Sequence, residues 1–172
     1  MPLAARIKKI KAVVVDVDGV LTDGKIIFDD AGKETKNFNV YDGFALVFLK
    51  RAGFKTAIIT ARASKTVTLR AKDLNIDRTY QDAFPKLTAY KKFLKEFHLK
   101  DENICFIADD LPDLQVLKRV GFAVSVLNGV EEIKREAHYI TKKHGGNGAV
   151  REAVELILKT QGKWNGVLAR YE

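Results

Sequence analysis

Short apolar runs alternate with amphipathic stretches along the whole chain. The runs are rich in β-branched residues, a pattern typical of strands buried on both faces of a sheet, and they lie at 11–17, 54–60, 103–108 and 122–127. Shorter strand-like pieces lie at 78–81 and 138–141. Apolar residues recur at helical spacing in six further stretches: 43–52, 64–75, 85–98, 111–120, 130–137 and 148–162.

One segment interrupts this alternation. Two strand-like pieces, 25–28 and 34–39, flank the turn sequence DDAGK, which predicts a β-hairpin directly after the first strand. Elsewhere strands alternate with helices, which predicts an α/β fold with a parallel sheet covered on both faces. The chain shows no repeat, low-complexity tract or linker. We therefore expect one domain over 1–172, with the hairpin as an insertion at about 25–39 and a loose tail at 162–172.

Composition narrows the class of protein. The chain has 172 residues and a net charge of +8, but its Lys and Arg are spread out and form no nucleic-acid-binding signature. No stretch approaches the 18 or so apolar residues that a membrane span requires. The single cysteine, Cys105, lies in an apolar run and has no partner for an internal disulfide. We expect a cytoplasmic protein that binds neither nucleic acid nor membrane.

Polar residues follow the predicted strands where those strands end. Asp16 and Asp18 follow the first strand, Thr60 follows the second, and Asp109 and Asp110 follow the strand at 103–108. The carboxyl ends of parallel strands meet at one edge of a sheet, where ligands bind. Converging carboxylates repel one another unless a cation lies between them, and all-oxygen ligands suit Mg²⁺.

A metal-bound acidic site of this kind can transfer a phosphoryl group. One carboxylate can attack phosphorus and form an aspartyl phosphate, while a second, two residues on, can protonate the leaving oxygen and later activate water. The Thr60 hydroxyl, the Ala61 amide and the Lys86 ammonium can hold the phosphoryl oxygens.

These residues also carry a family resemblance. DVDGVLTDG resembles the first motif of the haloacid dehalogenase superfamily, and Thr60, Lys86 and ADDLPD supply its other three motifs. FNVYDG, ITAR, YQDAFPK, IADDLPDL and GGNGAVRE are similar, in order and spacing, to the 3-deoxy-D-manno-octulosonate 8-phosphate phosphatase family over about residues 8–162. The resemblance implies a capless, three-layer Rossmann-like fold and a Mg²⁺-dependent phosphatase of a sugar-acid phosphate. It also implies a homotetramer assembled through the hairpin, in which each neighbour helps to close the active site.

Residue roles follow from the same resemblance. It implies Asp16 as the nucleophile, Asp18 as the general acid and base, and Thr60 and Lys86 as phosphate ligands. Asp16, the carbonyl of Asp18, and Asp109 would bind Mg²⁺. The substrate-facing positions of the family correspond to Asn39, Tyr41, Asp42, Gly43, Ala61, Arg62 and Arg70. Asp110 and Asp113 are either helix caps or partners of the metal site and Lys86.

Four positions depart from the family pattern. Tyr41 and Asn147 stand where the family has arginine, and Ala61 and Ala108 stand where it has glycine. Tyr41 and Asn147 each remove a cation that can meet a sugar carboxylate or a phosphate. The resemblance implies 3-deoxy-D-manno-octulosonate 8-phosphate (KDO 8-phosphate) as the substrate, and these two departures raise a sialic-acid-like nonulosonate 9-phosphate as the alternative.

Two other classes of protein share parts of this pattern. A signalling receiver domain places adjacent acidic residues after its first strand, whereas here Val17 separates Asp16 from Asp18 and the adjacent pair comes late. A non-catalytic assembly module of the same fold has no need for a complete acidic set, which is costly to keep together. The pattern favours the phosphatase.

Overall fold

The computed structural model describes residues 1–172 and contains a six-stranded parallel sheet in the order β5-β4-β1-β6-β7-β8. The strands are β1 (Ala12–Val15), β4 (Lys55–Ile59), β5 (Arg78–Tyr80), β6 (Ile104–Ala108), β7 (Phe122–Ser125) and β8 (Tyr139–Ile140). All four residues of β1 are buried, as its apolar sequence predicts. Val13 and Val15 pack into one apolar core and Ala12 and Val14 into another, because successive side chains of a strand point to opposite faces.

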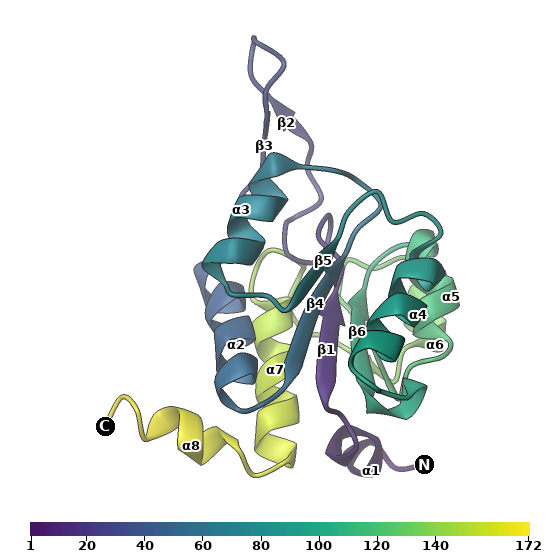
Figure 1. Cartoon of the computed structure of the whole chain (residues 1–172), viewed down its shortest axis with the longest axis vertical. Coiled ribbons are helices and arrows are strands. Elements are labelled where there is room, and N and C mark those ends of the chain that lie inside the picture. Colours follow the sequence, from purple (N-terminus) through teal and green to yellow (C-terminus); the bar gives the residue numbers. More distant parts are fainter.

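Helices cover both faces of the sheet, which confirms the predicted three-layer α/β architecture (Figure 1). The larger core of 28 buried residues lies beneath α1 (Leu3–Lys8), α2 (Val40–Arg51), α3 (Lys65–Asp73), α7 (Ala149–Thr160) and α8 (Trp164–Leu168). The smaller core of 14 lies beneath α4 (Lys86–Glu96), α5 (Leu114–Leu117) and α6 (Glu131–Glu136). Two 3-10 turns complete the helical elements: Asp101–Asn103 and Leu111–Asp113.

Two helices begin or end elsewhere than predicted. The helix expected at 43–52 begins at Val40, because the Asn39 side chain caps it by accepting from the backbone N–H of Tyr41 at 2.8 Å. Asp42, which directly precedes the expected start at residue 43 and could have capped a helix there, lies inside α2 instead. The stretch expected as one helix over 111–120 is instead a 3-10 turn followed by the four residues of α5. Asp110 caps that turn by accepting from the Leu111 N–H at 2.8 Å.

Both chain ends are more ordered than the sequence pattern indicates. The pattern gave no signal for α1, and the loose tail predicted at 162–172 contains α8. Trp164 packs edge-on against Phe48 of α2 with ring centroids 6.2 Å apart, and the Arg151 guanidinium of α7 lies 5.3 Å from the Trp164 ring centroid. These contacts hold the tail against α2 and α7, as aromatic and cation–π pairs do. No helix in the structure has the length and apolar character needed to cross a bilayer.

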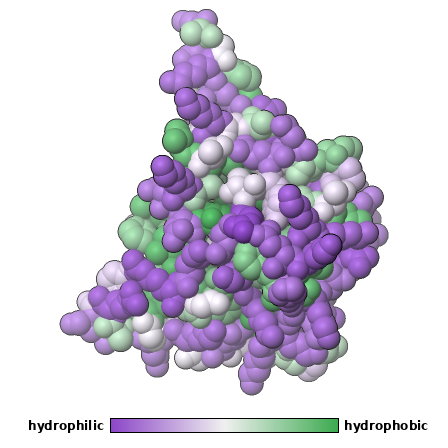
Figure 2. Space-filling model, viewed as in Figure 1, coloured by the Kyte–Doolittle hydropathy of each residue, from purple (hydrophilic) through white to green (hydrophobic).

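The predicted hairpin is present, although its paired strands are short. It consists of β2 (Ile27–Phe28) and β3 (Glu34–Thr35) and projects from the edge of the sheet where β1 ends (Figure 1). Hydrophilic residues cover most of the face drawn in Figure 2, and apolar residues appear in small patches, including on the hairpin. The exposed apolar residues of the hairpin are Ile26, Ile27 and Phe28, the last of them 59% exposed.

Candidate active site

The carboxyl ends of three neighbouring strands carry the predicted site residues to one edge of the sheet. Asp16 follows β1, Thr60 follows β4 and Asp109 follows β6, and the central β1 pairs in register with both other strands. The Asp16 N–H donates to the carbonyl of Ile107 at 3.2 Å, so the main chain fixes where Asp16 leaves the sheet. The predicted convergence of these residues at one sheet edge is thus confirmed.

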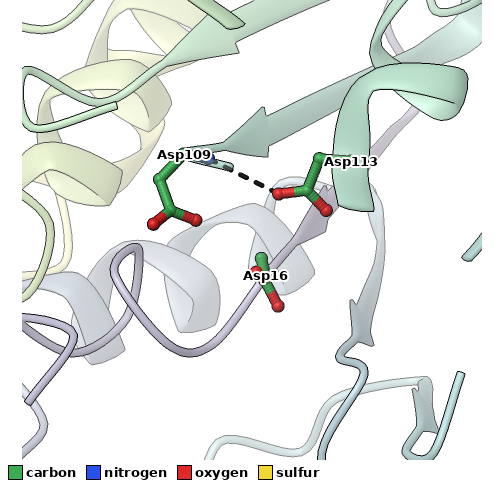
Figure 3. Close-up of side chains that lie close together, drawn as sticks. All are labelled: Asp16, Asp109 and Asp113. Atoms are coloured by element: carbon green, nitrogen blue, oxygen red, sulfur yellow. Dashed lines mark hydrogen bonds between the residues drawn. The ribbon is translucent and has the colours of Figure 1, made fainter. Parts of the chain in front are cut away.

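Three carboxylates form the centre of the site. Asp16, Asp109 and Asp113 each place one oxygen within 4.8 Å of the others (Figure 3). Asp16 and Asp113 are buried, and Oδ1 of Asp109 is buried without any hydrogen-bond partner. An orphaned buried carboxylate oxygen beside two other carboxylates fits a hard divalent cation such as Mg²⁺. The Asp113 carboxylate belongs to this cluster, whereas the sequence pattern was equally consistent with a helix cap or a partner of the site.

Lys86, the first residue of α4, neutralises part of this negative charge. Its Nζ lies 2.8 Å from Oδ2 of Asp16 and 2.5 Å from Oδ1 of Asp113, and its side chain is only 2% exposed. Burial by itself lowers the pKa of Lys86, but the two carboxylates outweigh burial and raise it. Lys86 therefore remains a cation in the interior.

One cation does not balance three carboxylates, and their pKa values reflect this. Burial, with the neighbouring Asp16 and Asp113 charges, raises the pKa of Asp109 to about 8. Burial and the charge of Asp16 raise the pKa of Asp113 to about 7. Burial also raises the pKa of Asp16, although Lys86 opposes the shift. A divalent cation in this cluster would favour the ionised form of all three.

The turn at Gly19, in the first motif, lies directly against the Asp109 side chain. Gly19 has φ +85°, and a Cβ at this position would lie 1.9 Å from Oδ2 of Asp109. The Asn128 side chain joins this turn to a more distant loop, because its Nδ2 donates to the Gly19 carbonyl at 3.0 Å and its Oδ1 accepts from the Gly145 N–H at 2.6 Å. The sequence pattern does not single out Asn128, because Asn followed by Gly129 is an ordinary turn signal.

The Asp18 side chain is not part of the three-carboxylate cluster and instead contacts the hairpin. Its Oδ1 contacts Nζ of Lys36, and its Oδ2 lies 3.8 Å from Nε of Arg62. Glu34 contacts both cations, at 3.0 Å from Lys36 and 3.1 Å from Arg62. Lys36 and Glu34 were not among the predicted site residues, because nothing in the sequence pattern shows that the hairpin folds back onto Asp18.

Thr60 and the start of the following loop lie beside this group. Thr60 is buried, and its Oγ1 accepts from the Arg62 N–H at 3.4 Å. The Arg62 side chain is 46% exposed. Ala61 lies between them in the loop after β4. Arg62 therefore links this loop to Asp18 and to Glu34 of the hairpin.

The remaining predicted substrate positions lie around the start of α2. Tyr41 is 64% exposed. The Asn39 carbonyl accepts from Nη2 of Arg70 at 3.4 Å, and a Cβ on Gly43 would lie 2.2 Å from the same nitrogen. Arg70 also pairs with Asp73 at 2.7 Å. Asn39, Gly43 and Arg70 thus form one packed group, and Tyr41 is the most exposed of the predicted positions here.

Asp42 differs from its neighbours because it is buried. Its Oδ2 accepts from the Gly148 N–H at 3.0 Å and its Oδ1 from the Arg151 N–H at 2.8 Å. Burial raises its pKa, although these hydrogen bonds oppose the shift. The carboxylate therefore caps α7, and both of its oxygens are already engaged.

Comparison with known proteins identifies a matching family and relatives of this chain. Residues 79–153 match the family of haloacid dehalogenase-like hydrolases. The 3-deoxy-D-manno-octulosonate 8-phosphate phosphatase of Yersinia pestis is 40% identical over 161 residues, which cover 94% of this chain and 86% of that protein. The enzyme of the same name from Escherichia coli K12 is 38% identical over 159 residues, covering 92% of this chain and 85% of that protein.

Solved structures agree with these relatives. The 3-deoxy-D-manno-octulosonate 8-phosphate phosphatase of Moraxella catarrhalis, in complex with magnesium, phosphate and KDO, superposes with a TM-score of 0.96. It is 44% identical, and the match covers 99% of this chain and 98% of that one. The cobalt-bound enzyme of Haemophilus influenzae has a TM-score of 0.89 at 34% identity, with 92% of each chain covered. The chain therefore belongs to the 3-deoxy-D-manno-octulosonate 8-phosphate phosphatase family of haloacid dehalogenase-like hydrolases.

Proposed function

We propose that this protein is a Mg²⁺-dependent phosphatase that converts 3-deoxy-D-manno-octulosonate 8-phosphate to KDO and inorganic phosphate. The observation that carries the proposal is the buried cluster of Asp16, Asp109 and Asp113 with Lys86 beside it. The magnesium, phosphate and KDO in the structure of the Moraxella relative support the same assignment.

The residues of the site have different roles in this reaction. Asp16, the carbonyl of Asp18, and Asp109 hold Mg²⁺, which when bound offsets the negative charge of the carboxylates and of the phosphoryl oxygens. Lys86 and Thr60 hold the phosphoryl oxygens, and the Ala61 N–H can donate to one of them. Asp110 caps the 3-10 turn, and Asp113 orients Lys86 through their 2.5 Å contact.

Hydrolysis proceeds in two steps. Asp16 attacks phosphorus, so that an Asp16–phosphorus bond forms while the bond from phosphorus to the sugar oxygen breaks, and Asp18 gives its proton to that oxygen. Water then attacks phosphorus and gives a proton to Asp18. The Asp16–phosphorus bond breaks, and inorganic phosphate is released. The Val17 N–H donates to Oδ1 of Asp16 at 2.7 Å and keeps the nucleophile oriented for both steps.

The sugar lies on the open side of the site. Tyr41 and Arg62 offer exposed side chains there, whereas Asn39, Asp42, Gly43 and Arg70 act by holding the start of α2 in place. A nonulosonate 9-phosphate is the second candidate substrate, because the exposed Tyr41 stands where the family motif has arginine. A complete acidic cluster opposes the alternative of a non-catalytic assembly module.

Assembly and location form the rest of the proposal. The hairpin exposes Ile26, Ile27 and Phe28, and such an apolar patch suits burial against other subunits of a homotetramer. The free thiol of Cys105 is buried and burial raises its pKa, which suits a reducing cytoplasm. There the enzyme would supply the KDO used for lipopolysaccharide precursors.

Phosphate release with Mg²⁺ tests the proposal. The substrates are KDO 8-phosphate, N-acetylneuraminate 9-phosphate and an aryl phosphate, and the variant is Asp16→Asn. Asp30→Asn, on the exposed tip of the hairpin, is the matched control. We expect release from KDO 8-phosphate to fall by about 10³-fold or more in Asp16→Asn and to persist in the control.

Other outcomes would change the substrate assignment, the enzyme assignment or the oligomeric state. Preferential release from the nonulosonate would show that Tyr41 and Asn147 mark a different sugar pocket. No release from any substrate by a protein that binds Mg²⁺ would refute the phosphatase assignment. Light scattering tests the tetramer, and a monomer at micromolar concentration would refute assembly through the hairpin.

A further inference from the structure

The Lys36 side chain is buried at the base of an otherwise exposed hairpin. Only 1% of it is accessible, whereas Lys33, three residues earlier in the same hairpin, is exposed. Removing an ammonium group from water is costly unless carboxylates compensate for it. Lys36 has two such partners: Oδ1 of Asp18, which it contacts directly, and Glu34 at 3.0 Å.

The two carboxylate oxygens of Asp18 have different contacts. Oδ1 accepts a hydrogen bond from Nζ of Lys36, whereas Oδ2 accepts none, and Nε of Arg62 lies 3.8 Å from it, beyond hydrogen-bonding distance. The Arg62 guanidinium is instead held by Glu34 at 3.1 Å. The hairpin therefore fixes the rotation of the Asp18 carboxylate and leaves Oδ2 as the oxygen without a hydrogen-bond partner.

We propose that Lys36 is a positioning residue that aims Oδ2 of Asp18 at the leaving-group oxygen of the substrate. This inference rests on the proposed function, because it concerns the first of the two steps. As the bond from phosphorus to the leaving oxygen breaks and the Asp16–phosphorus bond forms, the proton on Oδ2 moves to the leaving oxygen. Glu34 keeps Lys36 in place through their ion pair at 3.0 Å.

The leaving group distinguishes positioning from a merely structural role. A sugar alkoxide needs a proton in order to depart, whereas 2,4-dinitrophenolate departs as a stable anion without one. Loss of a positioned acid therefore slows transfer from the sugar phosphate alone. Loss of hairpin structure or of subunit assembly would slow both reactions alike. The value of kcat/KM reports this first step, since it excludes the later hydrolysis of the aspartyl phosphate.

The experiment compares Lys36→Met with Lys33→Met, which removes an exposed lysine of the same hairpin. In Lys36→Met we expect kcat/KM for KDO 8-phosphate to fall at least about tenfold, while the value for 2,4-dinitrophenyl phosphate changes by less than about threefold. Lys36→Arg should recover part of the loss, because it restores the cation. Lys33→Met should match the wild type on both substrates.

The failures of the two proposals are separable. An equal fall on both substrates, or no fall on either, would overturn the role of Lys36 while the wild-type rates still support a phosphatase. If the wild type prefers a different sugar phosphate, the same ratio is measured with that substrate. A wild type inactive on every substrate would overturn the proposed function and the role of Lys36 with it.

Discussion

Asp42 on α2 accepts a 2.8 Å hydrogen bond from the backbone N–H of Arg151, in the first turn of α7. The two residues are 109 positions apart in the sequence, yet this bond joins the helices that cover the same face of the sheet. An acidic side chain at a helix N-terminus satisfies a free N–H group and interacts favourably with the helix dipole. Asp42 is thus part of the frame that holds the start of α2 beside the site.

Asp42→Asn should destabilise the protein. The substitution keeps the shape but turns an amide NH₂ toward one of the two N–H groups that the carboxylate now satisfies. We expect the free energy of unfolding, measured with urea, to fall by about 1–3 kcal/mol. Asp30→Asn, on the exposed hairpin tip, should change it by less than about 0.5 kcal/mol. Equal stability of the two variants would show that the cap contributes nothing.

Stabilisation by Mg²⁺ should increase with pH. The pKa of Asp109 is about 8 in the metal-free protein and about 4 in an unfolded chain. The folded state therefore holds a proton that the unfolded state lacks between these values, and the metal-free protein loses stability as pH rises toward 8. Mg²⁺ replaces that proton, so we expect its effect on the melting temperature to be larger at pH 8.5 than at pH 6. Asp109→Asn should flatten this pH dependence, and a larger Mg²⁺ effect at pH 6 would contradict it.

Lys86→Met should impair both stability and catalysis. The substitution removes the ammonium group that contacts Asp16 at 2.8 Å and Asp113 at 2.5 Å, and neither carboxylate forms an ion pair with any other residue. Breaking a buried ion pair costs about 3 kcal/mol or more, and we expect Mg²⁺ to restore part of this loss. Phosphate release should fall by about 10²-fold or more, because a phosphoryl-oxygen ligand is missing. Lys91→Met, an exposed lysine of the same helix, should leave melting temperature and turnover unchanged.

Gly19→Ala should weaken metal binding. A Cβ at this position would lie 1.9 Å from Oδ2 of Asp109 and would displace that carboxylate from the cluster. We expect the Mg²⁺ dissociation constant, measured by calorimetry, to rise by about tenfold or more, because a displaced ligand forfeits its bond to the metal. Gly32→Ala is the matched control, because Gly32 also has positive φ but has open space where the Cβ would be. If both variants bind Mg²⁺ equally well, the close approach of Gly19 to Asp109 is unimportant.

The sequence predicted well wherever a side chain's position depends on the strand that carries it. Asp16, Thr60 and Asp109 meet at the sheet edge because parallel strands bring their carboxyl ends together. It predicted poorly wherever a contact joins segments without a shared pattern. The packing of Trp164 on Phe48 is one example, and the tail was therefore expected to be loose.

The alternation of apolar runs and amphipathic stretches by itself determined the parallel α/β sheet, and the polar residues after those runs determined the chemistry of a metal-assisted phosphoryl transfer. Only the tertiary structure decided which oxygens remain free. It buries Lys36 on Oδ1 of Asp18, commits both oxygens of Asp42 to α7, and leaves Oδ1 of Asp109 without a partner. The reason is that periodicity reports which face of an element is buried, whereas hydrogen bonds and ion pairs depend on where distant segments meet.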